Sequence, residues 1–283
     1  MTQYRISDAD VYLLDQWQEN SPPSVEAQRE QIFTRYISLG ARGREPYSPD
    51  QKGPLTPHEH EILNHARQPL AERKISDSTP WLRTYYASSP EASITWENIQ
   101  EEAASKTIGQ PIFYDDESLY NFGKEWSRIF MRAPQLLQYR GSVDEREEDI
   151  ATSLNEAIEG QNLDPERAKE EGYDPDEDTC PWPTFYNNYH LYLVIRRLNV
   201  VDEVTLSPVL KREGRKDAGK VKVVWFDECG RTVRYSRESV LQAAECVNLS
   251  NGEMDDYGCW VNARIGREYL WGESLGPPYG VNG

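Results

Sequence analysis

The spacing of apolar residues predicts helices through most of the first half of the chain. Val11, Leu14 and Trp17 recur at every third position after a polar run that is typical of a helix start. A second helix is predicted over residues 25–39, and a third begins after Thr56, where a proline occupies the first position and acidic residues follow it. This part of the chain is therefore expected to be mainly helical.

The longest of the predicted helices covers residues 116–139, because its apolar residues form one wide stripe. Pro134 is expected to kink or end it. Residues 40–54 are rich in glycine and proline and are expected to form a loop. The stripe consists of Leu119, Phe122, Trp126, Ile129, Phe130 and Leu137.

The apolar pattern changes character after residue 179. Phe185, Tyr189 and Tyr192 fit helical spacing, although the same apolar segment is also compatible with a buried strand. Residues 220–236 contain two β-rich runs around a turn sequence and predict an antiparallel hairpin. The fold class expected from these patterns is α+β, in which a mainly helical N-terminal region precedes a smaller mixed region with an antiparallel sheet.

The distribution of charged residues indicates a third region, which lies between the helical and the mixed regions. Residues 144–178 carry fifteen acidic and three basic residues and account for most of the net charge of −17. Their first half has helical spacing, and their second half has the composition of a solvated linker. The expected organisation is therefore a helical region at 1–143, an acidic helix plus linker at 144–178, and a mixed region at 179–283.

This acidic field favours some partners over others. A strongly negative surface repels nucleic acids and anionic membranes and attracts basic proteins, so a basic protein surface is the expected partner. The chain has no apolar run long enough to span a membrane and no secretory signal at its start. A soluble, cytoplasmic protein is expected, with reduced thiols at Cys180, Cys229, Cys246 and Cys259.

Three of the four histidines lie close together and raise the hypothesis of a metal site. His58, Glu61 and His65 are spaced so that neighbouring members share an edge of a helix. His58 and His60 are about 200° apart on a regular helix and cannot both reach one ion. The alternative is an exposed helix start with Glu61 and His65 as an i,i+4 pair.

An aromatic belt gives the second candidate site. Its rings could line a pocket for a flat ligand, with His190 as the general base, or could simply belong to the core. His190 is the only histidine in the C-terminal half of the chain. The belt consists of Trp182, Phe185, Tyr186, Tyr189 and Tyr192.

Motifs for nucleotide, phosphate or zinc binding and for serine hydrolases are missing from the sequence, so no cofactor is expected. The hypothesis that follows is an intracellular binding protein for a basic partner. The alternatives are an enzyme of another family that uses His190, and a structural subunit of a larger assembly.

Overall fold

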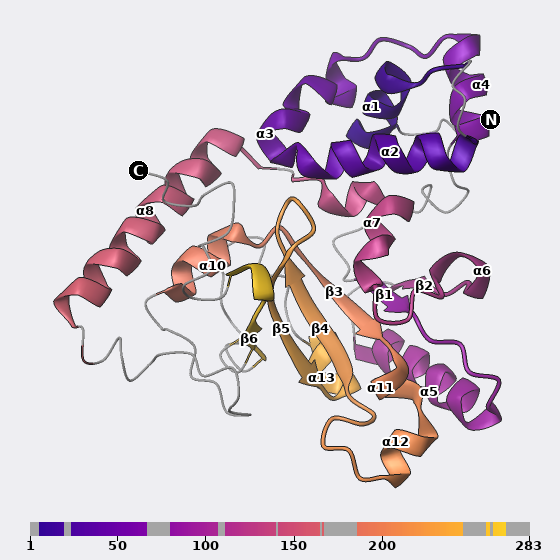
Figure 1. Cartoon of the computed structure of the whole chain (residues 1–283), viewed down its shortest axis with the longest axis vertical. Coiled ribbons are helices and arrows are strands. Elements are labelled where there is room, and N and C mark those ends of the chain that lie inside the picture. Colours follow the sequence, from indigo (N-terminus) through magenta and orange to yellow (C-terminus); the bar gives the residue numbers. More distant parts are fainter. Residues whose placement is uncertain are drawn as a thin grey trace. The chain divides into compact units, whose positions relative to one another are not determined.

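The computed structural model describes residues 6–19, 24–66, 80–106, 111–139, 141–164, 166, 186–245, 259–260 and 263–269. The chain divides into two compact units. Unit 1 comprises Met1–Ser76, Ser127–Val143 and the turn Glu228–Gly230. Unit 2 comprises Asp77–Trp126, Asp144–Asp227 and Arg231–Gly283. The helices and strands of the two units are labelled in Figure 1.

Unit 1 is helical in its described residues. Ser7 and Asp10 form a capping box at the start of the first helix, and Thr56 and Glu59 form the same arrangement before the fourth. Leu13, Ile32 and Leu63 meet in a buried cluster that holds these helices together. The helices are α1 Asp8–Gln16, α2 Val25–Ser38, α3 Gly40–Arg44, α4 Pro57–Ala66 and α7 Ile129–Arg132, with 3₁₀ turns η1 Glu45–Tyr47, η2 Pro49–Gln51 and η5 Pro134–Leu137.

The predictions of continuous helix over 116–139 and of a loop over 40–54 are both wrong. The first segment is broken into α6 Glu117–Tyr120, η4 Trp126–Arg128, α7 and η5. The first helical piece ends at its C-cap Asn121, which has left the helical conformation (ψ of 64°), Gly123 then adopts a left-handed conformation with φ of 56°, and Pro134 separates the last two pieces. The second segment contains α3, η1 and η2 instead of an open loop.

The described part of unit 2 contributes six strands to one mixed sheet, in the order β2-β1-β3-β4-β5-β6 (Figure 1). β1 pairs in parallel with β2 and with β3, whereas β3-β4, β4-β5 and β5-β6 are antiparallel. The strands are β1 Pro80–Arg83, β2 Ile112–Tyr114, β3 Arg196–Val201, β4 Val221–Phe226, β5 Thr232–Glu238 and β6 Arg264–Ile265.

This sheet confirms an α+β fold but corrects the expectation of an antiparallel sheet. β4 and β5 pair antiparallel where the hairpin at 220–236 is predicted. The two parallel pairs come from β1 and β2, which lie in the region predicted to be mainly helical. The helix α5, Pro90–Lys106, connects them and returns the chain in the same direction. The division of the sequence into 1–143, 144–178 and 179–283 stays a prediction.

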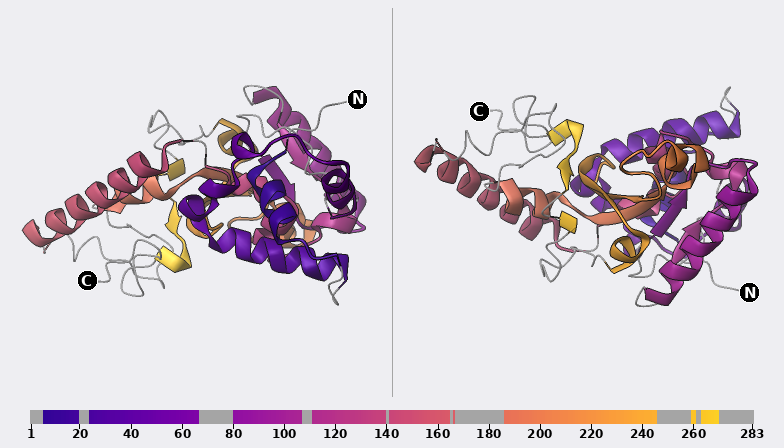
Figure 2. Two further views of the ribbon diagram at one scale, coloured as in Figure 1. Left: turned by 90° about the horizontal axis from the view of Figure 1, so that it is seen from above. Right: turned by 90° about the horizontal axis from the view of Figure 1, so that it is seen from below.

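Helices from distant parts of the sequence share one core with the sheet. Trp81, Val223 and Trp225 of the strands belong to the same buried cluster as residues of α5, α8 Val143–Leu163, α10 Asn187–Leu193 and α13 Val240–Glu245. Part of α8 extends past the strands of unit 2 (Figure 2). The remaining short elements are α11 Glu203–Leu206, α12 Pro208–Arg212 and η8 Arg267–Tyr269. None of the described helices has the length and apolarity that crossing a membrane requires.

Candidate functional site

The described part of the predicted aromatic belt lies on and beside α10. Tyr186 and Tyr189 are buried in the core of unit 2, with their ring centroids 6.2 Å apart, whereas Tyr192 is half-exposed. Trp182 and Phe185 lie outside the described residues. The two buried rings therefore contribute to core packing, and the hypothesis that the five form a ligand pocket stays a prediction.

His190 lies inside this aromatic cluster and is only 1% exposed. Its Nδ1 accepts hydrogen bonds from Nε and Nη2 of Arg234, at 3.2 and 3.0 Å. The rings of Tyr189 and Tyr269 lie 5.7 and 6.0 Å from the imidazole. A guanidinium can only donate, so Nδ1 is unprotonated and the neutral ring carries its proton on Nε2.

This arrangement determines what His190 can do chemically. Burial, and then the positive charge of Arg234, hold the pKa of His190 well below its ordinary value. A general base needs a lone pair that a substrate can reach. In this geometry the lone pair of Nδ1 is directed at Arg234 and Nε2 carries a proton, so the observed role is to bind a buried cation. Catalysis by His190 stays a prediction.

The buried His190 predicts a specific pH dependence of stability. Because its pKa is lower in the folded than in the unfolded chain, the unfolded chain takes up the extra proton. The stabilisation is complete above about pH 6.5 and is lost as pH falls below that value, by up to about 1.4 kcal/mol per pH unit. We expect His190→Gln, whose amide oxygen can still accept from Arg234, to remove this slope between pH 6.5 and 5.

Urea unfolding at pH 7.5, 6.5 and 5.5 measures this difference. His65→Gln is the matched control, because His65 is exposed on α4 and its replacement should leave the slope unchanged. A slope that persists in His190→Gln, or one that disappears in His65→Gln, would contradict the assignment.

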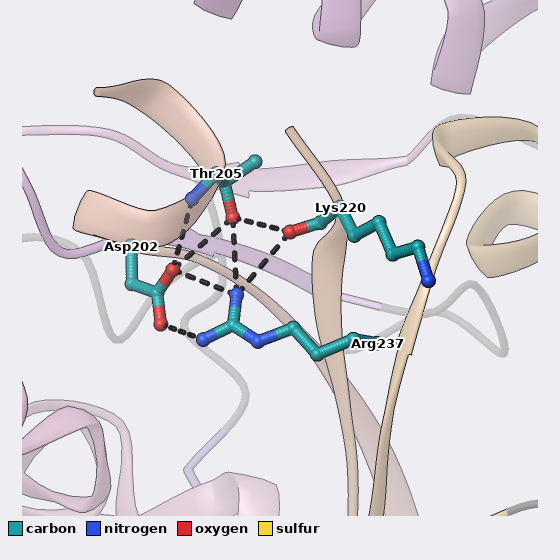
Figure 3. Close-up of polar contacts among 4 residues, drawn as sticks. All are labelled: Asp202, Thr205, Lys220 and Arg237. Carbon is teal, nitrogen blue, oxygen red and sulfur yellow. Dashed lines mark hydrogen bonds and ion pairs between the residues drawn. The ribbon is translucent and has the colours of Figure 1, made fainter. Parts of the chain in front are cut away.

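A second polar cluster ties the ends of three strands together (Figure 3). Asp202 follows β3 and is the N-cap of α11, where its carboxylate accepts from the backbone N–H of Thr205 at 3.2 Å. Both oxygens of the same carboxylate accept from Arg237 of β5, one of them at 2.8 Å. Thr205 and Arg237 also donate to the carbonyl oxygen of Lys220, at 2.8 and 3.2 Å.

The electrostatics of this cluster are those of a structural ion pair. Burial raises the pKa of Asp202, but the hydrogen bonds and charge of Arg237, together with the Thr205 donors, outweigh burial and hold that pKa below its ordinary value. Sequence reasoning missed the cluster, although Asp202 and Thr205 have the spacing of a helix N-cap. Nothing in the sequence pairs Asp202 with an arginine 35 residues away.

The residues of the metal hypothesis lie on the exposed surface of α4. His58, Glu61 and His65 are all exposed, and Nε2 of His58 lies 2.6 Å from a carboxylate oxygen of Glu19. Across the described ranges, no group of three or more histidine, cysteine, aspartate or glutamate side chains is arranged to hold a metal ion.

The expectation of a reduced thiol is wrong at Cys259. Cys259 is buried and disulfide-bonded. Cys229 is half-buried in the turn between β4 and β5. Cys180 and Cys246 lie outside the described residues.

The acidic segment is described as far as residue 166, and most of that part is α8. One side of this helix, with Ile150, Leu154 and Ala157, is buried in the core of unit 2. Its opposite side exposes the carboxylates of Glu148, Asp149, Glu156 and Glu159. At 100° per residue these four positions fall within an arc of about 100°, so they form a continuous acidic stripe.

The single basic residue of α8 does not neutralise this stripe. Arg146 is buried, and its guanidinium donates to the carbonyl oxygens of Leu193 at 2.9 Å and Tyr192 at 3.3 Å. None of the four carboxylates of the stripe forms an ion pair with another described residue. The stripe therefore presents only negative charge to solvent.

Searches of protein-family models, curated proteins and solved structures find no significant match to the chain.

Proposed function

We propose that the protein is an intracellular binding protein whose partner is a basic protein surface, and that the acidic stripe of α8 is the binding surface. The observation that carries this proposal is the orientation of α8. Its apolar side and its only base are buried, while Glu148, Asp149, Glu156 and Glu159 are exposed on the opposite side.

The lack of neighbouring bases favours a basic partner for the stripe. Carboxylates that already have bases beside them gain little from a basic partner, because they must exchange one ion pair for another. The carboxylates of the stripe have no such pairs among the described residues. Each new exposed pair contributes little by itself, but a row of aligned pairs adds up and steers the partner during association.

The length of the stripe indicates the shape of the partner. Glu148 and Glu159 are eleven residues apart in one helix, which corresponds to about 16 Å. A basic helix or an extended segment with several lysines or arginines along one side matches this length. A single basic residue would engage only one end.

The test is the affinity for a labelled peptide of about twelve residues rich in lysine and arginine, measured by fluorescence anisotropy. The α8 variant carries Glu148→Gln, Asp149→Asn, Glu156→Gln and Glu159→Gln. With about 0.3–0.5 kcal/mol lost for each pair, we expect roughly tenfold weaker binding in low salt. The difference should shrink at physiological ionic strength, where exposed charges are screened.

A matched variant separates the stripe from net charge. Glu97→Gln, Glu101→Gln, Glu102→Gln and Glu117→Gln remove the same number of exposed carboxylates from α5 and α6. We expect this control to weaken peptide binding by no more than about twofold. Equal losses in the two variants would show that the peptide responds to net charge alone, and the proposal would fail.

The other two hypotheses have less support. Catalysis by His190 lacks an accessible lone pair in the observed geometry. A structural role in a larger assembly is not favoured by any specific contact. Both stay predictions.

A further inference from the structure

A locally basic surface lies on the segment of unit 2 that joins α12 to β4. Residues 211–216 contain four basic side chains and one acidic side chain, Glu213, in a chain whose net charge is −17. All five side chains are exposed, and α12 with the loop after it projects beyond the ends of the strands (Figure 1). We call this surface the basic tip. Its basic residues are Lys211, Arg212, Arg215 and Lys216.

Backbone hydrogen bonds fix the conformation of the basic tip. Gly214 has φ of 72° and ends α12, and the N–H of Arg215 donates to the carbonyl oxygen of Leu210 at 3.1 Å, as in a Schellman motif. Gly219 anchors the other end, because its N–H donates to the carbonyl oxygen of Val204 at 3.0 Å. A ligand therefore meets bases on a structured turn and does not have to order a flexible loop first.

Most of the bases of the tip have no ion-pair partner. Among the described residues, Lys211, Arg215 and Lys216 form no ion pair. Arg212 lies 3.8 Å from a carboxylate oxygen of Glu91, and both side chains are mostly exposed. The carboxylates of α8 do not supply the missing charge, because the strands of unit 2 separate α8 from α12 (Figure 1). Bases without partners can pair with an acidic ligand without giving up an existing ion pair.

Exposed apolar side chains lie next to these bases. Val209 is 52% exposed and precedes Arg212 by one helical turn, and Ile94 is 56% exposed and follows Glu91 by one turn of α5. Unpaired bases beside apolar side chains match an acidic peptide that also carries an apolar residue. A nucleic-acid strand offers phosphates but no aliphatic side chain, and the net charge of −17 repels a long polyanion more strongly than a short peptide.

We propose that the basic tip is a second interaction surface of this protein, and that it binds an acidic peptide segment with an apolar residue among its carboxylates. The carboxylates pair with Lys211, Arg215 and Lys216, and the apolar residue packs on Val209. Exposed ion pairs are individually weak, so the complex is sensitive to salt. The surface shares no residue with the acidic stripe of α8, so a failure of peptide binding here would leave the proposed basic partner untouched.

The test is the affinity of the full-length protein for a short labelled peptide that is rich in glutamate and has one central leucine, measured by fluorescence anisotropy. The tip variant carries Lys211→Gln, Arg215→Gln and Lys216→Gln. At low ionic strength we expect it to bind roughly five- to tenfold more weakly than the unmodified protein, because three exposed ion pairs are lost. The difference should shrink at physiological ionic strength, where exposed charges are screened.

A matched variant separates the basic tip from net charge. Lys106→Gln, Lys124→Gln and Arg267→Gln also remove two exposed lysines and one exposed arginine from unit 2. We expect this control to weaken peptide binding by no more than about twofold. Equal losses in the two variants, or no binding by the unmodified protein at low ionic strength, would overturn the proposal.

The variant Val209→Ser tests the apolar part of the surface. We expect roughly threefold weaker binding of the leucine peptide, because a small apolar contact is lost. A peptide with serine in place of the leucine should bind both proteins equally, and an equal loss with both peptides would overturn the apolar contact. Single-stranded DNA with the same charge as the peptide should bind more weakly, and tighter binding of DNA would overturn the peptide as the class of partner.

A second copy of the chain is another source of an acidic segment. Light scattering at low ionic strength is expected to give the mass of a single chain, because two copies with a net charge of −17 repel each other. An oligomer that is lost both in the tip variant and in the α8 variant would assign the basic tip to the acidic stripe of a second copy, and a separate acidic partner would be overturned.

Discussion

Replacement of Arg44 by alanine is expected to destabilise unit 1 by about 4 kcal/mol. Arg44 is only 3% exposed. Its guanidinium donates to the carbonyl oxygens of Gly40 at 2.7 Å, Leu137 at 3.1 Å and Glu228 at 2.5 Å. These carbonyls belong to three segments of unit 1 that are far apart in the sequence. Alanine removes all three donors and leaves buried carbonyl oxygens without them.

A neighbouring arginine provides the control for this prediction. Arg42 is nearly half-exposed in the same helix and forms a surface ion pair with Glu45 at 3.2 Å. Arg42→Ala should therefore change stability by less than about 1 kcal/mol. Arg44→Lys keeps the charge but loses the planar fork, so an intermediate loss is expected.

Urea unfolding combined with hydrogen exchange measures these losses. A chain with two compact units can unfold in more than one step, so the amides of α2 and α3 report on unit 1 separately. Similar stabilities of Arg44→Ala and Arg42→Ala would show that the buried guanidinium does not hold the three segments together.

Local sequence signals predicted the parts of the fold that depend on near neighbours. The capping residue Ser7 starts α1 as expected, and α2 ends before Gly40, which has φ of 67°. The β4-β5 pair also appears where alternating residues flank a short turn. In each case the interaction partners lie within a few residues of one another, so a single segment contains the whole signal.

Signals that depend on distant partners were missed. β1 and β2 are four and three residues long, too short to show a period, and they become strands only by pairing with each other and with β3. The apolar stripe over residues 116–139 predicts one helical face. Its members lie on several short helical pieces and turns instead, and four of them are buried there, because burial requires apolar residues whatever the backbone conformation. The four are Trp126, Ile129, Phe130 and Leu137.

The residues of the candidate site also divide into those whose partners are near in the sequence and those whose partners are distant. The acidic and apolar sides of α8 follow from the helical spacing of Ile150, Leu154 and the carboxylates, so this surface could be predicted. The surroundings of His190 could not, because Arg234 comes from a strand 44 residues later.

Asp202→Asn is expected to destabilise unit 2 by about 3 kcal/mol. The side chains of Asp202 and Arg237 are 17% and 18% exposed, so the pair is mostly but not fully withdrawn from water. The neutral amide retains one acceptor oxygen, but it turns a donor toward the guanidinium and leaves the charge of Arg237 without its carboxylate. The N-cap of α11 is weakened at the same time.

The pH dependence and a matched control make this prediction specific. Because the pKa of Asp202 is lowered on folding, the pair stabilises the protein above about pH 4, and this stabilisation is lost as pH falls through the folded pKa. The difference between Asp202→Asn and the unmodified protein should therefore shrink in acid. Asp217→Asn, at the exposed pair with Lys220, should cost less than about 1 kcal/mol.

A double-mutant cycle then assigns the loss to the pair itself. Removal of Arg237 after Asp202 has become neutral should cost less than its removal from the unmodified protein, because the uncompensated guanidinium has gone. Urea unfolding of Asp202→Asn, Arg237→Gln and the double variant gives the coupling energy, which we expect to be about 2 kcal/mol. Simple additivity of the two single changes would mean that Asp202 acts only as a helix cap, and the ion pair would contribute nothing to holding β3 and β5 together.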